Sequence, residues 1–163
     1  MILYTIGFTQ KSAQEFFGLL NQNRVECLVD IRLKPSGQLS GFAKQDDLPY
    51  FLHELAGGCQ YVHVPLLAPT KDILENYRRD GDWLAYEKLF EKLMDERDVP
   101  NRLDRAIFES KRCCLLCSEA IPKKCHRRLV AERLAFRWSD VEIVHLLKKR
   151  MGKSLPNMFP NTR

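Results

Sequence analysis

Short apolar segments of strand character alternate along this chain with segments of helical periodicity. Strands are predicted at 2–6, 25–31, 60–64, 112–117 and 141–146. Several of them are apolar on both faces, so both faces need cover, and parallel strands must be joined by helical crossovers. We therefore expect a single three-layer α/β domain, with a mostly parallel sheet of about five strands and helices on both faces.

The segments between the strands carry helix signals. Residues 12–15, Ser-Ala-Gln-Glu, form a capping box ahead of apolar residues at helical spacing. Further helices are predicted over 46–56, 71–79, 83–97, 101–110 and 122–138. Residues 33–44 have no clear periodicity, and they are predicted to form either a flap over an anionic ligand or a plain surface loop.

Length and composition fit one domain over 1–147, followed by a basic tail over 148–163. No apolar run approaches the roughly 18 residues of a membrane span, and no basic region precedes the apolar N-terminal stretch. We expect a cytoplasmic protein with no membrane partner, in which the six cysteines remain thiols.

The net charge of +5 is unevenly distributed. Residues 1–100 hold 11 Lys/Arg and 15 Asp/Glu, whereas residues 101–163 hold 15 Lys/Arg and 6 Asp/Glu. A basic C-terminal third favours a polyanionic partner, either nucleic acid or a phosphorylated small molecule. A solvated basic surface is the simpler alternative.

Polar residues gather where the predicted strands end. Ligands of open parallel sheets bind at the carboxyl ends of the strands. Gly7 ends the first strand, Asp30 and Arg32 the second, His63 the third, and Cys117 and Glu119 the fourth. We assign ligand binding at this edge to Gly7, Asp30, Arg32, Pro35, His63 and Arg127.

The predicted helix over 122–138 begins with cations, where acids are usual. A bound anion would turn that unfavourable charge into a favourable one. Arg127 lies on the same helix face as the apolar Val130 and Ala131, so its guanidinium needs a partner. That partner is expected to be the carboxylate of Asp30 or Glu119, or an oxyanion of the ligand.

The same stretch holds the candidates for catalysis. Cys125, near the third position of the predicted helix and beside cations, is a candidate thiolate nucleophile, and Cys117 at a strand end is a second one. His126 or Glu119 would move protons. Unreactive, packed cysteines and structural pairs between Asp30 or Glu119 and the arginines are the alternatives.

A zinc site is the competing interpretation of the cysteines. Cys114 and Cys117 are three apart in a strand, so they point to opposite faces and should not bind one ion together. Cys117, Cys125 and His126 remain, with a further ligand such as His63 needed, and the spacing matches no usual zinc pattern. We therefore assign no metal and no cofactor.

Several segments together resemble a known family. They are 4–7 (Tyr-Thr-Ile-Gly), 30–35 with its Asp-Ile-Arg and Pro, 61–63, 116–122 and 125–129 (Cys-His-Arg-Arg-Leu). These segments resemble the domain-of-unknown-function 488 family from residue 1 to about 147. The resemblance implies a compact α/β domain with these residues grouped, and no agreed reaction. Relatives often have His-Ser after the first glycine, where this chain has Phe8-Thr9, so a mechanism that needs that histidine is unavailable to this chain.

These observations favour an enzyme, a hydrolase or transferase, acting on a nucleotide or nucleic-acid substrate with Cys, Glu and His at the strand ends. One alternative is a nucleic-acid-binding module without chemistry, which would use the basic C-terminal third. Another is a regulator that depends on a metal or on thiol redox chemistry. The sequence does not indicate an oligomeric state.

Overall fold

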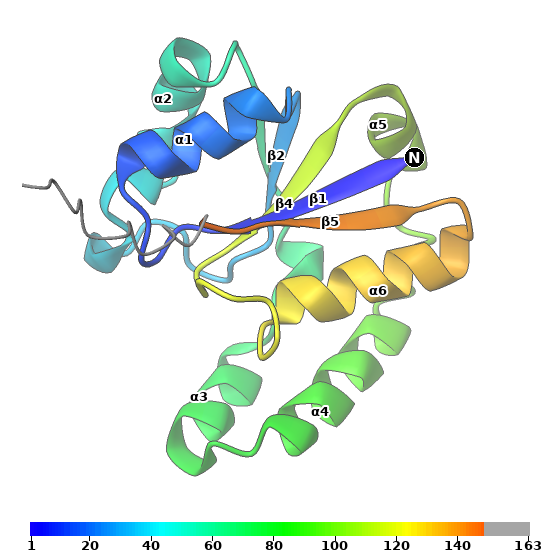
Figure 1. Cartoon of the computed structure of the whole chain (residues 1–163). Coiled ribbons are helices and arrows are strands. Elements are labelled where there is room, and N and C mark those ends of the chain that lie inside the picture. The colour runs from blue at the N-terminus through cyan, green and yellow to red at the C-terminus, as the bar shows by residue number, and fades with distance from the viewer. Residues whose placement is uncertain (149–163) are drawn as a thin grey trace, which may run out of the picture.

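A computed structural model describes residues 1–148, and Figure 1 shows a central sheet between two layers of helices. The five strands are all parallel, in the order β3-β2-β4-β1-β5. They are β1 (Ile2–Gly7), β2 (Cys27–Asp30), β3 (Gln60–His63), β4 (Cys113–Cys117) and β5 (Glu142–Leu146). The predicted α/β class and all five strands are confirmed, each strand to within two residues at either end.

Helices cover both sides of the sheet, as Figure 1 shows. The first layer holds α1 (Ala13–Gln22) and α2 (Leu48–Leu55), and the second holds α3 (Lys71–Asp80), α4 (Trp83–Glu96) and α6 (His126–Trp138). The short α5 (Arg105–Ser110) precedes β4. The predicted capping box is present, because Ser12 Oγ accepts from the Glu15 N–H and Glu15 Oε2 accepts from the Ser12 N–H.

Strand β4 shows how the core divides between the two layers. Cys113 and Leu115 pack in the cluster that contains α4 and α6, whereas Cys114 and Leu116 pack in the cluster that contains α1 and α2. Because side chains alternate along a strand, Cys117 points to the α6 side, opposite Cys114. All six cysteines are free and buried.

The helix predicted from residue 122 begins instead at His126, so that prediction is wrong at its start. Cys125 is the extended N-cap, with φ −144° and ψ 136°. Residues 118–125 form turns because the Arg127 guanidinium bonds to the carbonyls of Glu119 and Ala120 and holds them outside the helix. Two smaller differences concern other segments. Asp104 caps α5, so the helix predicted over 101–110 starts at 105. The loop expected over 33–44 contains a 3₁₀ segment, Gln38–Ala43.

The chain reverses direction across the sheet between β2 and β4. After β2 it crosses through α2 to β3, and after β4 it crosses through α6 in the opposite direction to β5. Such a switch point opens a crevice between the two diverging loops, and ligands of α/β sheets bind there. The loops after β2 and β4 are therefore where a site is expected.

The predicted tail over 148–163 lies outside the described residues except for Lys148, whose Nζ is 2.9 Å from Glu15 Oε1. Within residues 1–148, none of the helices has both the length and the apolar character required to cross a membrane.

Candidate functional site at the β2–β4 edge

A cavity of about 320 Å³ opens at the switch point, between the loops after β2 and β4 and the helices α3 and α4. Its volume is at the lower end of the range for small-molecule sites. Five of the ten predicted site residues line it: Arg32, Cys117, Glu119, Cys125 and His126. The structure therefore brings together all four predicted catalytic residues.

Cys117, Cys125 and His126 form the buried floor of this cavity, here called the thiol–imidazole cluster. His126 Nε2 lies 2.9 Å from the Ile31 carbonyl oxygen, so it must carry the proton and donate it. The unprotonated Nδ1 then faces Cys117 Sγ at 3.5 Å. The carbonyl thus fixes the tautomer, and a lone pair of the imidazole is directed at the sulfur.

The two thiols of the cluster differ in acidity. A hydrogen bond from the Cys125 thiol lowers the pKa of Cys117. The Arg127 charge and the backbone N–H groups of Glu119 and Ser118 also lower this pKa, whereas desolvation by burial raises it. Burial, together with that bond, raises the pKa of Cys125. Of the pair, Cys117 is therefore the more acidic thiol. The three ligand atoms of the cluster lie within 4.8 Å of one another, so they could also hold a metal ion.

Aromatic side chains form one wall of the cavity. Trp83 and Tyr86 stack with ring centroids 4.9 Å apart, and Tyr77 contacts both at 5.7 and 5.2 Å. The series continues inward through Phe90, whose centroid is 5.6 Å from that of His126. A planar ligand placed against Trp83 would reach from the rim toward the floor cluster.

Cations surround the mouth. Lys34 comes from the loop after β2, Arg78 from α3 and Lys124 from the loop before α6, and all three are exposed. Within residues 1–148 none of the three is engaged in an ion pair, whereas Lys71 at the same rim lies 3.5 Å from Glu75. The Glu119 carboxylate also lines the cavity and likewise has no ion pair in the described chain.

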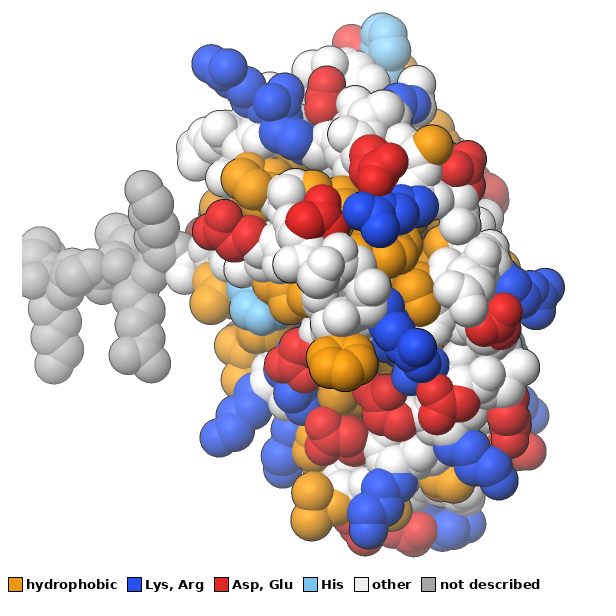
Figure 2. Space-filling view, turned by 90° about the vertical axis from the view of Figure 1, so that its right-hand side faces the viewer, with side chains coloured by type: hydrophobic (Ala, Val, Ile, Leu, Met, Phe, Trp, Pro, Cys, Tyr) orange, Lys and Arg blue, Asp and Glu red, His pale blue; other side chains and the backbone are white. Residues whose placement is uncertain are grey.

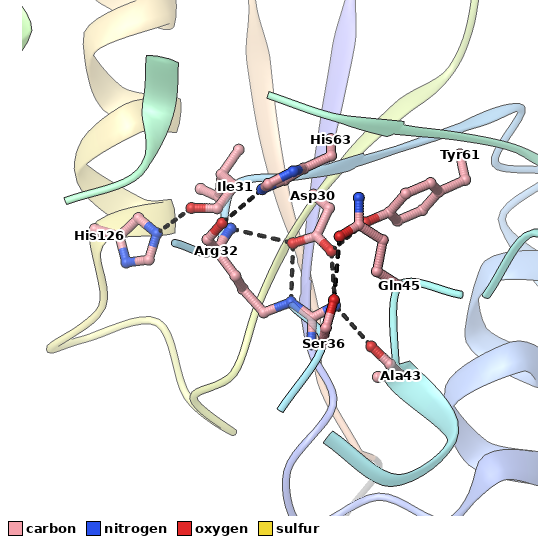
Figure 3. A network of polar contacts seen from close by, with 9 residues as sticks. All are labelled: Asp30, Ile31, Arg32, Ser36, Ala43, Gln45, Tyr61, His63 and His126. Atoms are coloured by element: carbon pink, nitrogen blue, oxygen red, sulfur yellow. Dashed lines mark hydrogen bonds and ion pairs between the residues drawn. The ribbon is translucent and has the colours of Figure 1, made fainter. Parts of the chain in front are cut away.

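The second polar cluster at this edge, the carboxylate–guanidinium cluster, consists of Asp30, Arg32 and Tyr61 (Figure 3). Arg32 Nε and Nη2 donate to the two oxygens of Asp30 at 2.8 and 2.6 Å, and the Tyr61 hydroxyl donates to Oδ2 at 2.7 Å. Arg32 Nη2 also donates to the Ala43 carbonyl at 2.7 Å. Asp30 is completely buried, so this cluster is an internal ion pair, one of the alternatives that the sequence left open.

The remaining predicted ligand residues lie outside the cavity lining. His63 Nε2 donates to the Arg32 carbonyl at 2.8 Å, so His63 and His126 hold successive carbonyls of the same loop (Figure 3). Pro35 is buried, and its carbonyl accepts from the Gln45 N–H. Gly7 is a close-approach position, because a Cβ there would lie 1.7 Å from the Glu119 carbonyl oxygen.

Arg127 is fully buried and continues the apolar face of α6, as predicted. The predicted carboxylate partner is wrong, because its guanidinium donates to main-chain carbonyls of the loop that follows β4. Nη1 also donates to Cys125 Sγ at 3.4 Å. Arg127 thus joins the loop to the thiol–imidazole cluster from behind the cavity.

Much of the positive charge of α6 is neutralised within the molecule. Arg128 pairs with Glu87, and Arg133 pairs with Glu91 and Asp95, all three of these acids lying on α4. On the face shown in Figure 2, basic and acidic side chains are interspersed and do not form a patch of one sign. The described part of the basic C-terminal third therefore offers less support for polyanion binding than its composition indicates.

Sequence reasoning missed the aromatic wall and most of the rim. Tyr86 is a buried core residue of α4, yet it also borders the cavity. The available signal was the pair Tyr77 and Trp83 on either side of the turn that ends α3 at Gly81. Two aromatic residues beside a cationic helix end would have indicated a surface for a flat anionic ligand.

Comparison with known proteins gives a family and no reaction. The family model described as "Domain of unknown function DUF488" matches residues 12–134, most of the chain. No curated protein and no solved structure matches the chain.

Proposed function

We propose that this chain, which belongs to the DUF488 family, is an enzyme that acts on a nucleotide or on one nucleotide of a nucleic acid, as a hydrolase or transferase. The observation that carries this proposal is the composition of one cavity. An aromatic wall, a cationic rim and the thiol–imidazole cluster all line it. A ligand with a flat ring and a phosphate complements that combination.

The wall and the rim divide the recognition of the substrate. A base would stack on Trp83, since the stacking of a base on an aromatic side chain contributes about 1–3 kcal/mol. The phosphate would lie among Lys34, Arg78 and Lys124, whose charges are not neutralised by ion pairs in the described chain. The modest volume of about 320 Å³ favours one nucleotide unit over a long strand segment.

The floor of the cavity supplies the reactive groups. The Cys117 thiol donates to the unprotonated Nδ1 of His126 at 3.5 Å, so this nitrogen can take the thiol proton and leave a nucleophilic thiolate, and the fixed tautomer keeps Nδ1 in that role. Glu119 borders the same cavity and is exposed, so its carboxylate is the group that would exchange protons with the substrate.

Thermal unfolding in the presence of a ligand panel tests the recognition step. The panel comprises ribonucleoside mono-, di- and triphosphates, with inorganic phosphate as the probe that lacks a base. Wild-type chain should be stabilised by at least one nucleotide more than by phosphate, and a ligand at about 100 times its Kd adds about 2.7 kcal/mol. Trp83→Ala should lose most of that stabilisation.

Phe136→Ala is the matched control, because Phe136 is an exposed aromatic of α6 that does not line the cavity. It should respond to the nucleotides as wild type does. Equal loss in both variants, or a panel in which no nucleotide stabilises the chain more than phosphate does, would overturn the proposal.

Product analysis of the best ligand, with Cys117→Ala and Glu119→Gln beside wild type, tests the chemistry. Products that form equally fast with all three chains would contradict the assigned centre.

A further inference from the structure

We propose that Cys117, Cys125 and His126 bind one zinc ion, with the fourth coordination position open toward the cavity. This inference rests on the proposed function, because it specifies the reactive centre of the same site. It reverses the assignment of no metal made from the sequence. The observation behind it is that Sγ of Cys117, Sγ of Cys125 and one ring nitrogen of His126 all lie within 4.8 Å of one another.

The fold resolves the objection that the sequence spacing raised. Cys117 ends β4, Cys125 is the N-cap of α6 and His126 is its first residue, so a loop and not a regular motif brings them together. Zinc bonds of about 2.3 Å to sulfur and 2.0–2.1 Å to nitrogen, in a tetrahedron, place sulfur about 3.6 Å from nitrogen. The observed distance from Cys117 Sγ to His126 Nδ1 is 3.5 Å.

Two of the three ligands already have a supporting group outside the cluster. Histidine ligands of metals usually donate their other ring N–H to a carbonyl or a carboxylate, and His126 Nε2 donates to the Ile31 carbonyl. Arg127 Nη1 donates to Cys125 Sγ at 3.4 Å. Such donors stabilise thiolates, which are the form that binds zinc.

The number of ligands indicates the kind of site. Among the described residues, no fourth Cys, His, Asp or Glu joins the group, and His63 is occupied with the Arg32 carbonyl. Structural zinc sites have four protein ligands, whereas catalytic sites have three and an open position, Cys₂His among them. The three residues line the cavity, so water or a substrate phosphate oxygen would take the fourth position.

The net charge of two thiolates and a neutral imidazole also suits zinc. Together they balance the charge of a divalent ion, and the buried Arg127 charge lies beside the sulfur atoms. Soft sulfur ligands select zinc over magnesium or calcium, which take oxygen ligands.

Cobalt(II) is the spectroscopic probe for this site. The full chain is stripped with a chelator, titrated with Co²⁺ and then with Zn²⁺ as competitor. We expect one equivalent of Co²⁺, with the intense d–d bands of a tetrahedral site and a thiolate-to-cobalt charge-transfer band, both removed by Zn²⁺. Cys117→Ser and Cys125→Ser should each weaken Co²⁺ binding by about 100-fold or more. Cys59→Ser, which changes a buried cysteine outside the cluster, should bind like wild type.

A wild-type chain without a charge-transfer band, or a Cys59→Ser chain that binds as weakly as the cluster variants, would overturn the zinc site. If the cluster variants do not fold, alkylation of the wild-type chain replaces them. Zn²⁺ should slow modification of Cys117 and Cys125 by about tenfold or more, and equal rates with and without the ion would contradict the site.

The nucleotide panel, run on the same stripped protein, separates the two proposals. Nucleotide stabilisation without cobalt binding overturns the zinc site and supports the proposed function. Cobalt binding without any response to nucleotides overturns the proposed function and supports the zinc site.

Discussion

Two polar clusters occupy the same edge of the sheet, and they differ in how far their bonding capacity is used. In the carboxylate–guanidinium cluster, Asp30 accepts from Arg32 and Tyr61 and is fully buried. In the thiol–imidazole cluster, the Cys117 thiol donates to His126 Nδ1 at 3.5 Å, and both groups border a cavity. The Asp30 carboxylate is satisfied within the chain, and only Arg32 Nη1 of that cluster is buried without a hydrogen-bond partner in the described residues, whereas the sulfur and ring nitrogen of the second cluster remain available to a ligand. Convergence on strand ends therefore does not by itself identify a site.

The sharpest test of this difference compares the stability of a variant from each cluster. Arg32→Ala leaves the buried Asp30 carboxylate without its charged partner, and breaking a buried pair in this way lowers the free energy of unfolding by about 3–5 kcal/mol. Cys117→Ala removes one buried sulfur and should lower it by about 1 kcal/mol. Urea denaturation of both variants measures this. Equal losses would show that the two clusters do the same structural work.

Gly7→Ala tests whether the loop that supports the thiol–imidazole cluster depends on close approach to β1. The added Cβ would lie 1.7 Å from the Glu119 carbonyl oxygen and 2.9 Å from Arg127 Nη1, so the loop must move. We expect a loss of about 3 kcal/mol in urea denaturation, as for overpacked sites. Gly18→Ala is the control. Nothing lies within 4 Å of its Cβ position in α1, and it should stabilise the chain by about 0.5–1 kcal/mol.

Tyr61→Phe probes the carboxylate–guanidinium cluster more gently. It removes one hydrogen bond to Asp30 and should lower the free energy of unfolding by about 1 kcal/mol. Burial, then the bond to the Asp30 carboxylate, raises the pKa of Tyr61. The folded chain thus holds this proton more tightly than the unfolded chain. The resulting stability is complete below pH of about 10 and is lost as the pH rises above it. The variant should lose less stability in that alkaline range, and identical pH profiles would refute the coupling.

Lys124→Ser gives the smallest effect and concerns the rim. Removing one exposed cation should weaken binding of the best nucleotide about three- to fivefold, and less at high salt. Lys88→Ser removes an exposed lysine of α4 that does not line the cavity, so calorimetric titration should give the wild-type affinity. A loss of the same size in both variants would mean that only net charge matters.

The fold was predictable because burial leaves a direct record in the sequence. Strands such as β4, with every residue apolar, are covered on both faces, and the capping box at Ser12 fixed the start of α1. The start of α6 was not predictable from Pro122, which suits a first helical turn. The actual start depends on Arg127 bonding to carbonyls of the preceding loop, a tertiary contact without a local signature.

Only part of the candidate site could be predicted from the sequence, for a related reason. Residues at strand ends are readable once the sheet is known, so Cys117 and Glu119 were found. The wall formed by Tyr77 and Trp83 belongs to a helical hairpin that no strand end marks. Whether an arginine closes an ion pair, as Arg32 does, or holds carbonyls, as Arg127 does, depends on packing that periodicity does not encode.

The most direct test of the central claim is the alkylation rate of Cys117 in chelator-treated protein, measured by peptide mass mapping with and without the nucleotide that stabilises the chain most. A ligand stacked on Trp83 covers the floor of the cavity, so we predict that the nucleotide slows modification of Cys117 by about tenfold or more. The control Cys59, a buried cysteine outside the cavity lining, should show only the slowing that general stabilisation produces. A Cys117 rate that changes no more than that of Cys59 would contradict the account.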